Sequence, residues 1–69
     1  MTINEIVAHN IRWKRESLRM TRWNLAVGAL LSLDYIEAME NGRRIPSLSA
    51  LDRIAKALGV TASDLLREV

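Results

Sequence analysis

The stretch from residue 32 to residue 46, SLDYIEAMENGRRIP, brings together side chains that could bind a charged partner. Its first part carries three carboxylates and no basic residue, and its second part carries two adjacent arginines. These charged residues are Asp34, Glu37, Glu40, Arg43 and Arg44. Guanidinium groups match the oxygens of a phosphate, whereas carboxylates repel them. The arginines therefore favour binding of an anionic partner, whereas the carboxylates of the same segment oppose it.

Other kinds of chemistry have little support in the chain. It contains no Cys, which excludes disulfides, thiolate metal sites and Cys nucleophiles, and His9 is its only His. No nucleophile–base set, phosphate-cradling Gly loop or ligand cluster stands out. The sequence therefore predicts that the protein is not an enzyme and that it binds no cofactor or metal.

The length and composition bound the remaining possibilities. A chain of 69 residues predicts a single domain, residues 1–69, and a core small enough to favour a partner chain. The formal net charge of +2 is weak support for a polyanionic partner by itself. No apolar run approaches the ~20 residues of a membrane span, and the beginning of the chain has no cleavable signal pattern. We expect no membrane association and a cytoplasmic location.

Five helical segments are predicted from capping residues and apolar spacing. The expected capping residues are Thr2, Thr21, Ser32, Ser47 and Thr61. The first segment ends near Arg19, the third ends at Gly42, the fourth ends at Gly59, and the last runs through Leu65, Leu66 and Val69. No segment shows the alternation of a strand, so we expect a compact all-α domain of five helices.

The junction between the second and third segments indicates a function. Only the residues LLS, 30–32, separate these two short helices. Two helices joined so closely are typical of a helix-turn-helix unit, here about residues 21–41, in which the second helix enters the major groove of DNA.

Residues 10–66 resemble the phage repressor and Cro type of helix-turn-helix domain, the XRE-like family. The matching pieces are NIR at 10–12, Arg15, LA at 25–26, YI at 35–36, ENGRRIPSL at 40–48 and IAKALGV at 54–60. The resemblance implies a lambda-repressor-like fold and a sequence-specific transcriptional regulator, expected to be a homodimer on a two-fold operator in double-stranded DNA.

The resemblance also implies roles for particular positions. The base-reading candidates on the third helix are Ser32, Leu33, Asp34, Glu37 and Ala38. The candidates for contact with the DNA backbone are Arg22, Trp23, Tyr35, Asn41, Arg43 and Arg44. Arg15 and Glu40 match a structural pair that joins the first helix to the end of the third. A small terminal helix often helps to form a dimer, which points to Leu65, Leu66 and Val69.

Several positions depart from the family pattern. Leu30 replaces the Gly of the turn, and because a left-handed Leu costs roughly 1–2 kcal/mol, we expect the turn geometry to shift. Arg19 replaces the Gly after the first helix, and Arg22 replaces the usual Gln of the second. Trp23 is expected to be exposed, whereas Trp13 is expected at the edge of the core.

The base-reading positions lack Gln, Asn, Arg and Lys, which pair bidentately with purine edges. Leu33 and Ala38 could contact thymine methyl groups, and Asp34 could accept a hydrogen bond from cytosine N4. Asp34 would also suit the positive end of the helix dipole without touching a base. Affinity would then come from flanking phosphate contacts, with help from DNA shape. The alternative is a protein-interaction module, in which this helix docks a protein partner through Leu33 and Trp23.

Overall fold

The computed structural model describes residues 1–68 and consists there of five α-helices without a strand. The helices are α1 (Ile3–Ser17), α2 (Arg22–Ala29), α3 (Leu33–Glu40), α4 (Leu48–Leu58) and α5 (Ala62–Leu65). Each begins directly after one of the five expected capping residues, whose side-chain oxygen accepts a hydrogen bond from a backbone N–H of the first turn. The all-α fold and the helix starts are confirmed.

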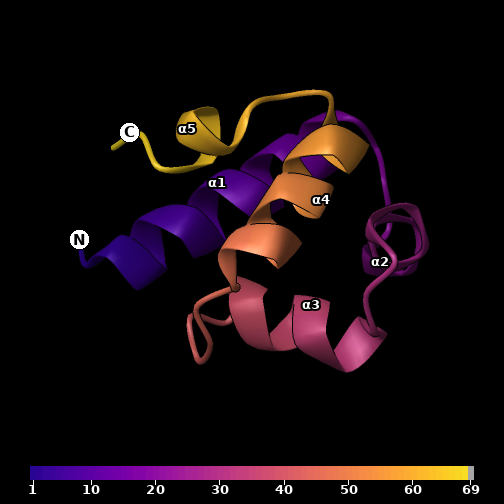
Figure 1. The fold of residues 1–69 in the computed structure, drawn as a ribbon, viewed down its shortest axis with the longest axis horizontal. Coiled ribbons are helices and arrows are strands. Elements are labelled where there is room, and N and C mark those ends of the chain that lie inside the picture. The colour runs from indigo at the N-terminus through magenta and orange to yellow at the C-terminus, as the bar shows by residue number, and fades with distance from the viewer. Residues whose placement is uncertain (69) are drawn as a thin grey trace.

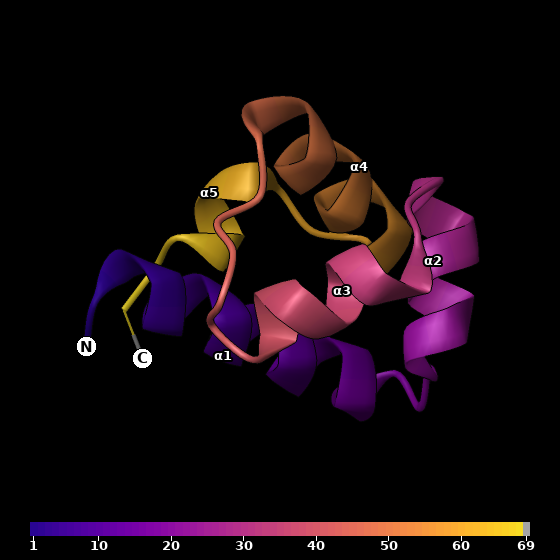
Figure 2. The ribbon, with the colours of Figure 1, turned by 90° about the horizontal axis from the view of Figure 1, so that it is seen from below.

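Helix α4 contacts three of the other helices, α2, α5 and α1. Figure 1 shows it between α5 and α3, with α2 to one side, and Figure 2 shows α3 crossing close to α1. Helix α4 packs most extensively against α2, and α1 packs against α3. The buried apolar cluster is formed by Val7, Ile11, Leu25, Ala26, Ala29, Ile36, Met39, Leu51, Ile54, Ala55, Leu58 and Leu65. This core fixes α2 and α3 relative to each other.

The end of the chain differs from the expectation. Helix α5 ends at Leu65 instead of continuing through Leu66, and Val69 lies outside the described residues. The side chain of Asn10 on α1 donates to the carbonyl oxygens of Leu65 and Arg67, at 2.9 and 2.7 Å. These carbonyls are thus held by α1 and not by a further helical turn, so the segment after α5 runs back along α1.

Trp13 was expected at the edge of the core, and this expectation is wrong, since 62% of the residue is exposed. The buried face of α1 includes Val7, Ile11 and Arg15, which are spaced four residues apart. At 3.6 residues per turn, Trp13 lies on roughly the opposite side of the helix from Ile11. Within residues 1–68, no helix is both long and apolar enough to span a membrane.

Candidate nucleic-acid interface

The helix-turn-helix unit is built from α2, the turn at residues 30–32, and α3. Thr21 and Asn24 form a reciprocal capping box at the start of α2, with N···O distances of 2.9 and 3.0 Å. Ser32 accepts a hydrogen bond from the backbone N–H of Tyr35 at 3.1 Å, and this bond begins α3. The buried residues Leu25, Ala29 and Ile36 anchor both helices in the core. The unit is therefore a rigid support for the exposed side of α3.

The turn keeps a left-handed residue although that residue is Leu. Leu30 has φ 58° and ψ 44°, so the expected shift in turn geometry is wrong. Its backbone N–H donates to Val27, and the next N–H donates to Ala26 at 2.9 Å, so two carbonyls at the end of α2 are satisfied. The side chain is 78% exposed and avoids a clash with the core. The turn bears the left-handed strain, roughly 1–2 kcal/mol, because these helix-ending bonds depend on it.

A buried carboxylate joins α1, α2 and α3. The Glu40 side chain is fully inaccessible to solvent. Its oxygens accept hydrogen bonds from Nε and Nη2 of Arg15, at 2.7 and 3.1 Å, and from Nε of Arg22 at 3.0 Å. Arg15 also donates to the carbonyl of Met20 at 2.8 Å. The hydrogen bond to Glu40 raises the pKa of Arg15 above its ordinary value. Glu40 is therefore a structural ion-pair partner and not part of the solvent-facing acidic surface.

The exposed side of α3 carries the base-reading candidates. Ser32 and Asp34 are exposed, and Leu33, Glu37 and Ala38 are half-buried. Neither Asp34 nor Glu37 forms an ion pair with any residue between 1 and 68. Two carboxylates and two apolar side chains thus remain available on this side, which can give few hydrogen bonds to DNA bases.

Cationic groups lie just beyond the end of α3. Asn41, Arg43 and Arg44 are exposed, and the described chain offers no acidic partner to either arginine. The Arg44 guanidinium lies over the Tyr35 ring, 4.7 Å from its centre, in a cation–π arrangement. The Tyr35 hydroxyl accepts a hydrogen bond from the backbone N–H of Ser47 at 3.1 Å. Tyr35 therefore connects α3 to the start of α4 and orients Arg44.

Helix α2 also presents an exposed apolar stripe. Trp23 and Val27, which are 62% and 57% exposed, are four residues apart and lie on one side of α2, and Leu30, which is 78% exposed, follows at the left-handed end of the helix. The expected exposure of Trp23 agrees with the structure. Sequence reasoning considered Leu30 only as a turn residue and did not consider Val27, although the spacing of Val27 from Trp23 was a usable signal.

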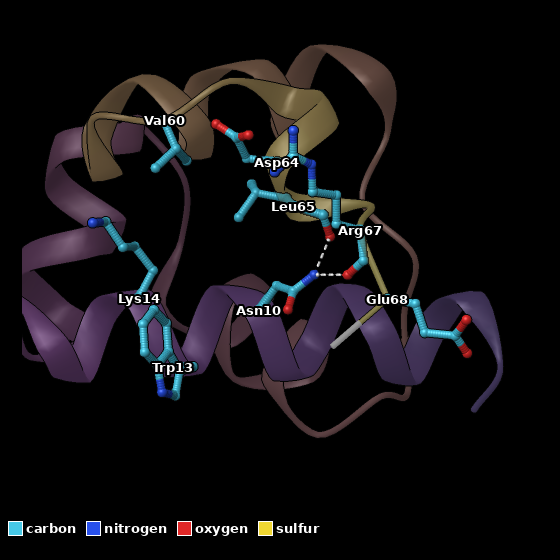
Figure 3. A pocket seen from close by; sticks show the side chains of 8 residues that line it. All are labelled: Asn10, Trp13, Lys14, Val60, Asp64, Leu65, Arg67 and Glu68. Carbon is cyan, nitrogen blue, oxygen red and sulfur yellow. Dashed lines mark hydrogen bonds between the residues drawn. The ribbon is translucent and has the colours of Figure 1, made fainter.

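Two polar contacts were missed by sequence reasoning. The bond between Arg22 and Glu40 had one signal, namely an arginine where the family has Gln, but the distance across the fold was unknown. The contact of Asn10 with the carbonyls of residues 65 and 67 had no signal in the sequence. It lies beside a surface pocket between α1 and the end of the chain, where Trp13, Lys14 and Val60 also contribute (Figure 3). Among residues 1–68, no group of three or more His, Cys, Asp or Glu side chains could hold a metal ion.

Comparison with known proteins agrees with this architecture. A family model described as helix-turn-helix matches residues 11–65. The chain is 37% identical over 62 residues to an immunity repressor protein of Bacillus phage phi105, covering 90% of this chain and 43% of that protein. It is 32% identical over 63 residues to the HTH-type transcriptional regulator DdrOP3 of Deinococcus deserti, covering 91% of this chain and 49% of that protein. It therefore spans less than half the length of these curated relatives.

A solved structure is also similar. The crystal structure of a hypothetical transcription factor from Neisseria superposes with a TM-score of 0.91 at 32% identity, covering 96% of this chain and 76% of that one. The fold and the arrangement of α2 and α3 define a helix-turn-helix domain. The chain belongs to the helix-turn-helix family, and relatives in that family are named as repressors and transcriptional regulators.

Proposed function

We propose that this chain is the DNA-binding part of a sequence-specific transcriptional regulator of the repressor type, with α3 in the major groove of a two-fold operator. One observation carries the proposal: cationic side chains lie at the start of the helix-turn-helix unit and directly after α3, whose outer side carries no basic residue. Arg22 lies at the start of α2, and Arg43 and Arg44 follow α3 without an acidic partner in the described chain. DNA phosphates are anions that such a set of guanidinium groups can bind. A regulator of this kind acts in the cytoplasm.

The proposal also accounts for an acidic and apolar reading helix. Because Glu40 is buried, only Asp34 and Glu37 present negative charge toward the groove. Affinity comes from the flanking arginines, and Leu33 and Ala38 discriminate modestly through thymine methyl groups. Ser32 can still donate its hydroxyl hydrogen to a base, since its oxygen only accepts at the cap. Sequence preference is then weak at each position, with further selection through DNA shape.

A selection from random duplexes tests this proposal. At low salt, a folded protein should enrich a motif with two-fold symmetry. Arg43→Ala and Arg44→Ala should weaken binding to all sequences alike and reduce the salt slope by about one unit each. Failure to enrich any motif would lead us to abandon the repressor interpretation.

We also propose that the active form is a homodimer. Leu65 was expected at the interface, but it is 2% exposed and belongs to the core. Leu66 and Trp13, which are 43% and 62% exposed, are better candidates. Sedimentation at micromolar concentration should detect a dimer, with or without DNA, and Leu66→Arg should weaken it. A strict monomer on a single asymmetric half-site would contradict this proposal.

A protein-interaction module is the second candidate function, favoured by the exposed stripe of Trp23, Val27 and Leu30. Contiguous exposed apolar side chains often mark contact sites for proteins. In that case Leu33→Lys should abolish binding of the partner, and no specific DNA motif should emerge from the selection.

A further inference from the structure

The further inference rests on the proposed DNA-binding function and concerns the way in which Arg22 meets a phosphate. Nε of Arg22 donates to Oε1 of Glu40 at 3.0 Å, and the described chain offers no acceptor to its terminal Nη groups. About a third of the Arg22 side chain is accessible, at 35%. One edge of the guanidinium is thus fixed, and its other donors remain free.

The partner of Arg22 is itself rigidly held. Glu40 has no accessible side-chain surface, and two hydrogen bonds from Arg15 fix both of its oxygens. Arg15 is 8% exposed and is held in turn by the carbonyl of Met20 at 2.8 Å. The position of the Arg22 guanidinium is therefore set by three helices and not by its own flexible stem.

The charges of this cluster also matter. Arg15 and Arg22 carry one positive charge each and Glu40 one negative charge, so these three side chains have a formal charge of +1. The exposed carboxylate of Glu16, 3.9 Å from Arg15, is also paired with Arg12 and leaves this sum unchanged when both are included. Arg15 alone would be neutralised by Glu40. It is Arg22 that makes the cluster attractive to an anion, because its guanidinium carries donors on three nitrogens in fixed directions, so that Nε can bind Glu40 while the terminal nitrogens bind a second anion.

We propose that Glu40 is a positioning residue for DNA binding: it fixes Arg22 so that the free guanidinium donors meet a single backbone phosphate. An arginine held in this way loses less side-chain freedom on binding than a free surface arginine does. Losing that freedom typically weakens binding by about three- to tenfold. A lysine is a poor replacement, because all three donors of an ammonium group lie on one nitrogen, which cannot occupy the positions of both Nε, at the buried carboxylate, and the terminal nitrogens, at the phosphate.

The decisive comparison is Arg22→Lys against Arg43→Lys, measured on a short mixed-sequence duplex by fluorescence anisotropy over a range of salt concentrations. Arg43 is the matched control, because it is exposed and has no acidic partner among residues 1–68. Arg22→Lys should weaken binding about five- to tenfold, nearly as much as Arg22→Ala, and should reduce the salt slope by almost one unit. Arg43→Lys should weaken it less than about twofold.

Glu40→Gln gives a second, independent test, performed at a temperature at which circular dichroism shows that the variant is folded. Charge alone predicts tighter binding, since the variant gains a net positive charge. If Glu40 positions Arg22, Glu40→Gln should instead weaken binding by about three- to tenfold. Arg22→Ala should then weaken binding less in the Glu40→Gln protein than in the native protein. Arg22→Lys does not remove the buried carboxylate, so this variant keeps the proposal testable if Glu40→Gln does not fold.

The outcomes separate this inference from the proposed function. If Arg22→Lys binds like the native protein, or if Glu40→Gln binds more tightly, the positioning role is overturned while DNA binding stands. If Arg22→Ala, Arg43→Ala and Arg44→Ala all leave binding to the duplex unchanged, the proposed function itself fails.

Discussion

Replacing Glu40 by Gln should destabilise this protein more than any other conservative change on α3. The variant keeps the shape of the side chain but removes a buried negative charge that accepts hydrogen bonds at 2.7, 3.1 and 3.0 Å. Arg15, which is 8% exposed, then keeps only the exposed carboxylate of Glu16, at 3.9 Å, as a counter-ion. Breaking a buried ion pair by removing one partner typically costs about 3–5 kcal/mol.

The structure places the expected cost near the lower end of that range, about 3 kcal/mol. Arg15 keeps its hydrogen bond to the carbonyl of Met20, and the amide oxygen of Gln can still accept one hydrogen bond. A chain of 69 residues has a total stability of about 3–10 kcal/mol at ordinary values per residue. The loss is therefore a large fraction of the total, and it should lower Tm by at least about 12 °C.

Urea and thermal unfolding followed by circular dichroism measure this cost. Glu37→Gln is the matched control, since Glu37 lies on the same helix and has no ion-pair partner between residues 1 and 68. This control should change the free energy of unfolding by less than about 0.5 kcal/mol. If the free energy of unfolding of Glu40→Gln were within about 1 kcal/mol of that of the native protein, the buried ion pairs of Glu40 would not be needed to hold α1, α2 and α3 together.

Three further variants test other parts of the molecule. If Asp34 accepts a hydrogen bond from a cytosine, Asp34→Asn should change the sequence preference at one base pair by roughly 1–3 kcal/mol. If a selection instead shows tighter binding to all sequences, Asp34 only repels the DNA phosphates through its charge. Leu30→Asn should raise Tm by several degrees, because Asn tolerates φ near 58° and the lost side chain is 78% exposed; an unchanged or lower Tm would argue against strain in the turn. The hydrogen bonds with Thr61 hold the pKa of Asp64 below its ordinary value, so its contribution to stability is complete above that value and is lost as the pH falls below about 4. Asp64→Asn should therefore reduce the drop in Tm between about pH 6 and pH 3, and an identical drop in both proteins would contradict the role of this cap.

The helices and their starts could be predicted from the sequence because their signals are local. A capping side chain reaches only the next turn of its own helix, and each capping residue lies directly before an apolar pattern. These capping residues are Thr2, Thr21, Ser32, Ser47 and Thr61. The family was recognisable for the same reason, since its motifs are short continuous runs.

Only the tertiary structure determined the contacts between residues that are far apart in the chain. Arg22 lies 18 residues from Glu40, and Asn10 lies 55 residues from Leu65. No local rule gives the direction of a long side chain across such separations, because the packing of whole helices sets it. The same packing left Trp13 exposed, although it was expected at the edge of the core, and kept Leu30 left-handed despite the cost of that conformation. The sequence alone thus determined which helices form, and only their packing decided which charged side chains are paired and which have no partner among residues 1–68.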